Sequence, residues 1–130
     1  EFLNEFNGEG IQHIALGTDD IFKTVANLVA NGVPLQETPA TYYQKLDARV
    51  PGHGEDTTAL QKLNILLDGA PTEGQGILMQ IFTKDAIGPV FFEIIQRKGN
   101  EGFGEGNFQA LFESIELDQI QRGVLDEKKA

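Results

Sequence analysis

A carboxylate within an apolar stretch is the feature of this sequence with the clearest potential for chemistry. Glu93 lies in the middle of residues 90–97, which read VFFEIIQR. If these residues form a β-strand, alternation places Glu93 on one face with Phe91 and Ile95, and the residues between them point to the other face. A carboxylate buried in this way is costly unless it is paired, hydrogen-bonded or bound to a metal ion. Glu93 is therefore a candidate for an ion pair or for a metal ligand.

A lone imidazole lies in a second short apolar stretch, residues 12–16, which read QHIAL. Together, His13 and Glu93 make a partial ligand set for a divalent metal. A lone strand histidine is more often a hydrogen-bonded core residue, and the structural alternative for Glu93 is a salt bridge to Arg97 or Lys98. A partner four residues along a strand lies about 13 Å away, which is too far for easy pairing. Taken alone, the residues leave both interpretations open.

Length and composition exclude several classes of function. The chain has 130 residues, the size of one domain, with 10 basic and 20 acidic residues and a formal net charge of -10. This charge argues against partners such as nucleic acids and anionic membranes. The absence of cysteine excludes disulfides, thiolate metal sites and a cysteine nucleophile. Residues 1–10 do not look like a signal peptide, and no apolar run approaches the length of a membrane span, so we expect a cytoplasmic protein.

Hydrophobic periodicity and turn residues predict the order of the secondary structure. A helix follows the first strand, with Asp19 or Asp20 at its N-cap and Gly32 at its end. The predicted strands are residues 11–17, 65–68, 77–83 and 90–97, and the further helices are residues 41–50, 57–64 and a final helix from Asn107. The final helix has one apolar face, formed by Phe108, Leu111, Phe112 and Ile115.

This order of elements is a βαβββ unit of the α+β class, with helices inserted before the second strand and one helix added at the end. Four strands curved around a site form half of a barrel, which leaves a strand edge and an apolar face uncovered. We therefore expect a homo-oligomer, or a piece of a longer protein.

Four segments of the chain resemble the 4-hydroxyphenylpyruvate dioxygenase family of the vicinal-oxygen-chelate superfamily. Residues 8–16 resemble the strand of the second iron ligand, and residues 76–84 resemble a strand that lines the substrate pocket. Residues 91–97 resemble the strand of the third ligand, and residues 102–108 resemble the loop and terminal helix that cover the substrate. The four segments occur in the family's order, which makes the combination far more specific than any one of them.

The resemblance implies a vicinal-oxygen-chelate half-barrel and a non-haem Fe(II) dioxygenase. Its substrates would be O2 and the α-keto acid 4-hydroxyphenylpyruvate, and its products homogentisate and CO2, in tyrosine and phenylalanine catabolism. Carried over to this chain, the resemblance makes His13 and Glu93 iron ligands. The residues implied to line the substrate pocket are Gln80, Phe82, Phe103 and Phe108, with Phe91 at its border.

The sequence departs from the family at the first iron histidine, which the family carries one module earlier. This chain has two histidines, and His53 lies in a Pro-Gly-rich loop outside any ligand motif. We therefore expect residues 1–130 to be a single module, the C-terminal part of the catalytic domain of a longer dioxygenase, and to be inactive alone. Two alternatives stay open: a hydroxymandelate synthase, and a non-enzymatic protein that binds small molecules with the same fold.

The pocket assignments also have structural alternatives. Taken singly, Phe82, Phe103 and Phe108 read equally well as core residues. Gln80 is more discriminating, because its predicted neighbours on the same face are apolar. The glycines of residues 99–106 lack the spacing of a phosphate-binding loop, and we interpret them as a hinge or lid before the last helix.

Overall fold

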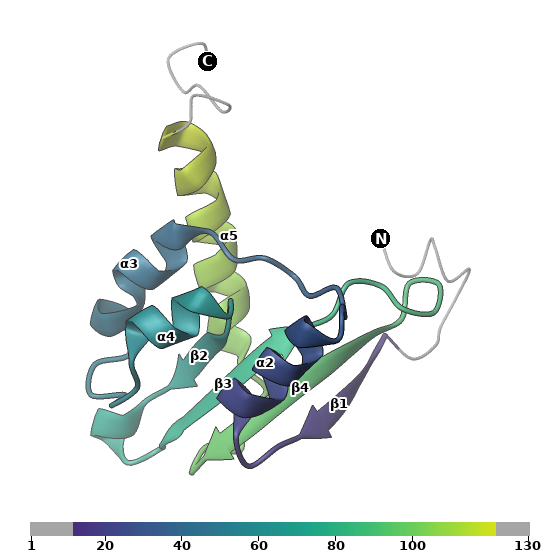
Figure 1. The fold of residues 1–130 in the computed structure, drawn as a ribbon. Coiled ribbons are helices and arrows are strands. Elements are labelled where there is room, and N and C mark those ends of the chain that lie inside the picture. The colour runs from purple at the N-terminus through teal and green to yellow at the C-terminus, as the bar shows by residue number, and fades with distance from the viewer. Residues whose placement is uncertain (1–11, 122–130) are drawn as a thin grey trace.

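A computed structural model describes residues 12–121 of the chain. They form a four-stranded sheet, and Figure 1 shows helices packed against it. The elements are β1 (His13–Gly17), α2 (Ile21–Ala30), α3 (Ala40–Arg49), α4 (Thr57–Lys62), β2 (Leu66–Gly69), η1 (Pro71–Glu73), β3 (Ile77–Phe82), β4 (Phe91–Lys98) and α5 (Glu105–Gln121). Within this part of the chain, no helix is both long and apolar enough to cross a bilayer.

The strand order β1-β4-β3-β2 confirms the predicted βαβββ unit. The first strand pairs parallel to β4, and the other two pairings are antiparallel. In the register, Ala15 of β1 and Phe82 of β3 both lie opposite Glu93 of β4. The central strand therefore places Glu93 between two neighbours, and β1 forms one edge of the sheet.

One face of the sheet carries the hydrophobic core. Ile21 and Val25 of α2 are fully buried and belong to the same cluster as Met79, Ile81 and Ile94 of the two central strands. Asp20 caps the start of α2, because its side chain accepts a hydrogen bond from the backbone N–H of Lys23. Figure 1 shows α2 lying across β3 and β4, with α3 and α4 toward β2. The same cluster continues into these two helices through Tyr42, Tyr43, Leu46 and Leu60.

The final helix differs from the sequence-based expectation in its start and in its buried face. It begins at Glu105 rather than at Asn107. The residues that it buries are Asn107, Ala110 and Ser114, whereas Phe108, Phe112 and Ile115 are exposed. Of the predicted apolar face, Leu111 alone packs against the core, as a partly buried residue. Polar residues turn inward here because Asn107 is hydrogen-bonded to buried side chains.

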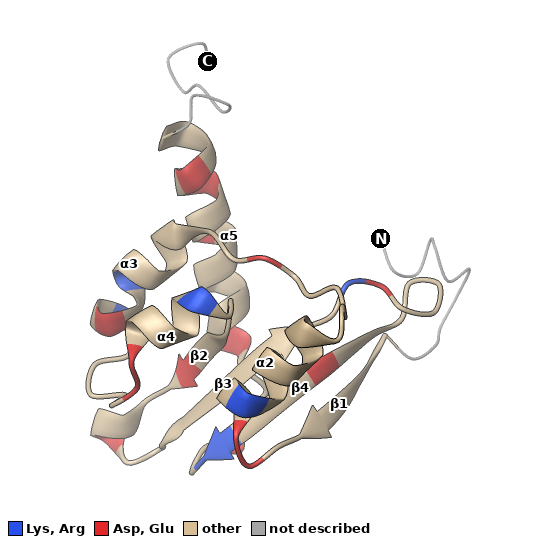
Figure 2. Ribbon diagram, viewed as in Figure 1, with Lys and Arg blue, Asp and Glu red and all other residues tan. Residues whose placement is uncertain are grey.

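The other predicted boundaries lie close to the observed ones. The predicted helix 57–64 ends at Lys62, because Asn64 adopts a left-handed backbone conformation with a φ of 59°. Residue 11 of the predicted first strand lies outside the described residues. Figure 2 shows Lys and Arg distributed over several elements of the described part, among Asp and Glu.

Candidate metal centre

His13 and Glu93 meet on the face of the sheet opposite the α2 core. His13 Nε2 lies 3.2 Å from Glu93 Oε1, and the two side chains are 36% and 8% exposed. They come from neighbouring parallel strands, where Ala15 lies opposite Glu93 and His13 lies opposite Phe91. The sequence therefore predicted a pair of residues that the fold brings into contact.

This separation fits two ligands of one metal ion. Two donor atoms that each lie about 2.1 Å from a metal, at right angles to one another, are about 3 Å apart. Among residues 12–121, no group of three or more His, Cys, Asp or Glu side chains is placed to hold a metal ion. The chain therefore offers part of a facial triad, and the third donor is not among its described residues.

His53 does not complete the pair. Its Nε2 lies 2.7 Å from the carboxylate of Asp47, and its Nδ1 accepts a hydrogen bond from the backbone N–H of Glu55. The hydrogen bond from His53 holds the pKa of Asp47 below its usual value. Because both ring nitrogens are used, His53 is a structural residue between α3 and α4.

The structural alternative for Glu93, a salt bridge to Arg97 or Lys98, is wrong. Arg97 donates to the backbone carbonyl of Asn100, and Lys98 pairs with Glu55 at 2.6 Å. The second carboxylate oxygen of Glu93 instead accepts a hydrogen bond of 2.6 Å from Gln80 Nε2. A buried carboxylate with one oxygen fixed by a donor and the other beside an imidazole is arranged as a ligand would be.

A cavity of about 510 Å³ opens beside the pair. Its lining residues are Gln12, His13, Gln36, Phe82, Thr83, Asp85, Phe91, Glu93, Phe103 and Phe108. Both candidate ligands and three of the four candidate substrate residues thus share one pocket. The fourth, Gln80, lies beneath the pocket, 1% exposed, where it contacts Glu93.

Aromatic rings form one wall of this pocket. The ring of His13 stacks on that of Phe91, and Phe82 meets Phe91 edge-on with ring centroids 5.7 Å apart. Phe82 and Phe108 face one another with centroids 6.4 Å apart and planes inclined by 24°. A third ring inserted between two faces needs about 7 Å. The present centroid distance is that of two rings in contact, so Phe82 and Phe108 would have to separate by under about an ångström to hold an aromatic ring between them.

Sequence reasoning missed several residues that the structure brings to the site. Gln36, Thr83 and Asp85 line the pocket, and Asn107 contacts Gln80 from α5. The sequence marked Asn107 as the expected helix start, within residues 102–108 that resemble the cover of the substrate. It gave no signal for the contact with Gln80, which lies 27 positions away.

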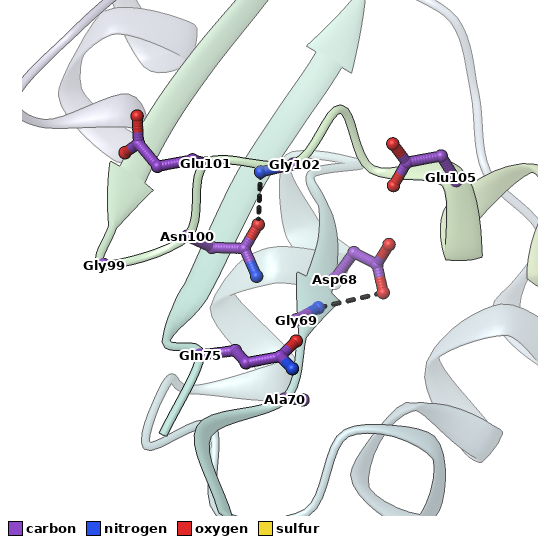
Figure 3. Close-up of a pocket in the computed structure, with 9 residues that line it drawn as sticks. All are labelled: Asp68, Gly69, Ala70, Gln75, Gly99, Asn100, Glu101, Gly102 and Glu105. Atoms are coloured by element: carbon purple, nitrogen blue, oxygen red, sulfur yellow. Dashed lines mark hydrogen bonds between the residues drawn. The ribbon is translucent and has the colours of Figure 1, made fainter. Parts of the chain in front are cut away.

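A second cavity, of about 460 Å³, lies among other residues (Figure 3). It is lined by acidic and amide side chains and backbone, among them Asp68, Asn100, Glu101 and Glu105. It shares no lining residue with the aromatic pocket and contains no imidazole. The combination of imidazole, carboxylate and aromatic rings makes the first pocket the candidate site.

Comparison with known proteins agrees with this geometry. The pattern of the Glyoxalase/Bleomycin resistance protein/Dioxygenase superfamily matches residues 3–50. A solved 4-hydroxymandelate synthase mutant from Streptomyces coelicolor superimposes with a TM-score of 0.70 and 36% identity, covering 91% of this chain and 33% of that chain. The fold is therefore that of the vicinal-oxygen-chelate class, as predicted.

The sequence comparison is more specific. The chain is 66% identical over 125 residues to 4-hydroxyphenylpyruvate dioxygenase of Pseudomonas aeruginosa, and 68% identical over 126 residues to a Vibrio vulnificus protein named hemolysin VllY. These matches cover 96–97% of this chain and 35% of each relative. The chain is thus a relative of the 4-hydroxyphenylpyruvate dioxygenases that spans about a third of their length.

Proposed function

We propose that this chain is the C-terminal part of the catalytic domain of a longer, cytoplasmic non-haem Fe(II) dioxygenase. Its reaction converts 4-hydroxyphenylpyruvate and O2 into homogentisate and CO2. Support comes from the contact between His13 and Glu93 beside an aromatic pocket, together with the identity to dioxygenases of this name.

In this proposal, His13 Nε2 and Glu93 Oε1 hold the iron, and a further ligand comes from outside the described residues. When bound, Fe(II) supplies open coordination positions at which an α-keto acid and O2 react. The carboxylate of Glu93 would balance part of the charge of the iron, and His13 would bind it through Nε2 in the same pocket. The chain thus provides both an anionic and a neutral donor to one ion.

The aromatic wall binds and orients the substrate. Phe82 and Phe108 face one another and would separate slightly to form a slot for the phenol ring of the substrate, and Phe103 also lines the pocket. Gln36 and Asp85 supply polar groups to the lining of the same pocket. An aromatic slot beside the ligand pair would place the keto acid end of the substrate toward His13 and Glu93 and exclude water from the ring.

The open edge of the sheet supports the second part of the proposal, that this chain works with additional chain. All five residues of β1 are exposed, including Ile14 and Leu16, and among the described residues this strand has one neighbour. An uncovered strand of this kind pairs readily with another chain or segment. The longer protein, or a homo-oligomer of this chain, would cover it.

An anaerobic Co(II) or Fe(II) titration tests the proposed function. The longer protein and its Glu93→Gln variant are titrated with and without 4-hydroxyphenylpyruvate. Glu116→Gln, on the exposed side of α5, is the matched control for the loss of one negative charge. We expect Glu93→Gln to lower metal affinity at least 100-fold and the control to change nothing.

Metal binding that is indifferent to Glu93, or ligand binding without metal, would favour the non-enzymatic small-molecule protein instead. Product analysis distinguishes the dioxygenase from the remaining candidate, a hydroxymandelate synthase, to which the chain is structurally similar. Homogentisate supports the dioxygenase, and hydroxymandelate supports the synthase.

A further inference from the structure

A chain of buried hydrogen bonds leads away from Glu93 into the interface between the sheet and α5. Gln80 Nε2 donates to Glu93 Oε2 at 2.6 Å, and Gln80 Oε1 accepts from Asn107 Nδ2 at 2.7 Å. Asn107 Oδ1 in turn lies 2.6 Å from the hydroxyl of Tyr42 and 3.3 Å from Arg49 Nη2. Gln80, Asn107 and Tyr42 are each 1% exposed. Water therefore has little access to this chain of hydrogen bonds.

Arg49 sets the direction of every bond in the chain. A guanidinium only donates, so an amide group that faces it must present its oxygen. The hydroxyl of Tyr42 already accepts from Arg49 Nη2 and from the backbone N–H of Leu67, both at 2.9 Å. Its own proton has two acceptors in reach, Asn107 Oδ1 at 2.6 Å and Leu67 O at 3.1 Å. Because Leu67 O also accepts from Arg49 Nη2 at 2.8 Å, the proton goes to the nearer Asn107 Oδ1. Because the oxygen of Asn107 faces these donors, its nitrogen faces Gln80.

The same polarity passes to Glu93. Gln80 must accept from Asn107 with its oxygen, and its nitrogen is therefore turned toward Glu93. An amide in the opposite orientation would place an oxygen against the carboxylate, and the two would repel. With Oε2 held by Gln80, Oε1 is the oxygen left facing His13.

We propose that Asn107 is a positioning residue that, oriented by Arg49, fixes the amide of Gln80 and so holds Glu93 with Oε1 directed at the metal. This inference rests on the proposed function, because it gives Glu93 the role of a ligand. It assigns a role to three residues, Arg49, Tyr42 and Asn107, that do not line the aromatic pocket.

Two glycines allow α5 to approach closely enough for these contacts. Gly104 has a φ of +77°, and a Cβ at this position would collide with the side-chain amide of Gln80. A Cβ on Gly106 would lie 2.6 Å from Asp68 Oδ1, and the backbone N–H of Gly106 donates to Asp68 Oδ2 at 2.8 Å. The Gly-rich segment that the sequence marked as a hinge or lid is thus packed directly on two side chains, and its role as a lid stays a prediction.

Asp68 ends the hydrogen-bonded chain on the far side. Its Oδ1 lies 3.3 Å from Arg49 Nη1, and its carboxylate stands on the wall of the second cavity in Figure 3, bonded to the backbone N–H of Gly69. The ion pair holds the guanidinium beside Tyr42 and Asn107, to which Nη2 donates. Arg49 is therefore itself held in position, and the direction of the hydrogen bonds that begin at Arg49 depends on this.

The decisive variant is Asn107→Asp, in the longer protein of the proposed function. Aspartate has the shape of asparagine and can still pair with Arg49, but it cannot donate to Gln80. Gln80 then turns its nitrogen to the new carboxylate and its oxygen to Glu93. We expect Co(II) affinity, titrated anaerobically by the visible absorption of the bound ion, to fall about tenfold. Asn27→Asp, the same change at an exposed position of α2, should have no effect.

A double-mutant cycle separates positioning from a merely structural role. If Asn107 acts through Gln80, then the loss caused by Asn107→Asp disappears when Gln80 is replaced by Met, which has no polarity to set. A structural role would leave the two effects additive. Additive effects, or Asn107→Asp binding Co(II) as tightly as the unchanged protein, would overturn the inference.

Arg49→Gln keeps the test open if Asn107→Asp does not fold. Glutamine can present either its oxygen or its nitrogen, so it no longer imposes one direction, and we expect a two- to fivefold loss that Gln80→Met again cancels. No loss would contradict the inference. Failure of the proposed function has a different signature, because the unchanged protein would then bind Co(II) without regard to Glu93→Gln.

Discussion

The two faces of the sheet are built from alternate residues of the same strands and obey different rules. Met79 and Ile81 point into the helix-covered core, while Gln80 between them points to the opposite face and is just as deeply buried. On the core face burial is stabilising mainly through apolar contact. On the site face burial is possible because each polar group has a partner: in the described part, no fully buried side-chain nitrogen or oxygen lacks one. The comparison shows that burial by itself does not distinguish a core from a site.

The core face should respond to lost volume with the largest effect on stability. Met79→Ala removes a fully buried side chain and leaves a cavity, which costs about 2–5 kcal/mol in the free energy of unfolding. Urea unfolding measures this cost. Ile14→Ala, at an exposed position of β1, is the control and should cost under about 1 kcal/mol. A Met79→Ala cost as small as that of the control would contradict the division between the faces.

The site face should respond in metal affinity rather than in stability. His13→Gln removes a donor from a side chain that is 36% exposed, so we expect at least a 30-fold loss of Co(II) affinity in the longer protein and little change in unfolding. His53→Gln should show the reverse, because His53 holds Asp47 and Glu55 and lies outside the pocket. Equal effects of the two substitutions on metal affinity would contradict the role of His13 as a metal ligand.

The exposed rings of α5 offer a finer comparison on one helix. Phe108 and Phe112 are 60% and 62% exposed, yet only Phe108 lines the pocket and faces Phe82. We expect Phe108→Ala to raise the KM for 4-hydroxyphenylpyruvate about tenfold, because the ring slot loses one wall. Phe112→Ala is the matched control, with the same loss of exposed area and no expected change in KM. Steady-state kinetics of the longer protein would show a shared effect if the slot were not used.

The expected effect that is smallest at neutral pH is a loss of stability that develops only above pH 10. Burial raises the pKa of Tyr42 from 10.0 to about 12, with Arg49 opposing the shift. The folded protein therefore holds this proton more tightly than the unfolded chain, and the contribution to stability is complete below pH 10 and is lost between pH 10 and about 12. The slope cannot exceed about 1.4 kcal/mol per pH unit for one group. Urea unfolding at several pH values compares Tyr42→Phe with the unchanged protein. The free energy of unfolding of Tyr42→Phe should decline less steeply above pH 10, because one of the two buried hydroxyls is gone. Some decline should remain, because burial also raises the pKa of the neighbouring Tyr43.

The sequence predicted those parts of the fold that depend on local pattern. Alternation along residues 90–97 placed Glu93 with Phe91, and the structure finds both on the pocket wall. The order of elements along the chain followed from periodicity and turn residues, and the α2 cap from the pair Asp19 and Asp20, of which the structure uses Asp20. These features are legible because a strand or a helix is specified within a few residues.

The partners of the buried polar groups could not be predicted in the same way. The bond between Gln80 and Asn107 joins residues 27 positions apart, and that between Tyr42 and Asn107 joins residues 65 positions apart. No local pattern encodes such distances. The apolar residues of α5 also predicted the wrong buried face. The helix buries Asn107, whose side chain is hydrogen-bonded to Gln80 and Tyr42, and leaves Phe108 exposed.

The place of β1 at the edge of the sheet makes the two candidate ligands unequal in how firmly they are held. Glu93 belongs to a central strand bonded on both sides, whereas His13 belongs to an edge strand bonded on one side, with every residue exposed. An edge strand of this kind opens locally at far lower free energy than the core of the sheet. An ion bound by both residues would act as a cross-link between the least and the most stable strands. The amide hydrogens of β1 would then report occupancy of the metal site through their exchange rates.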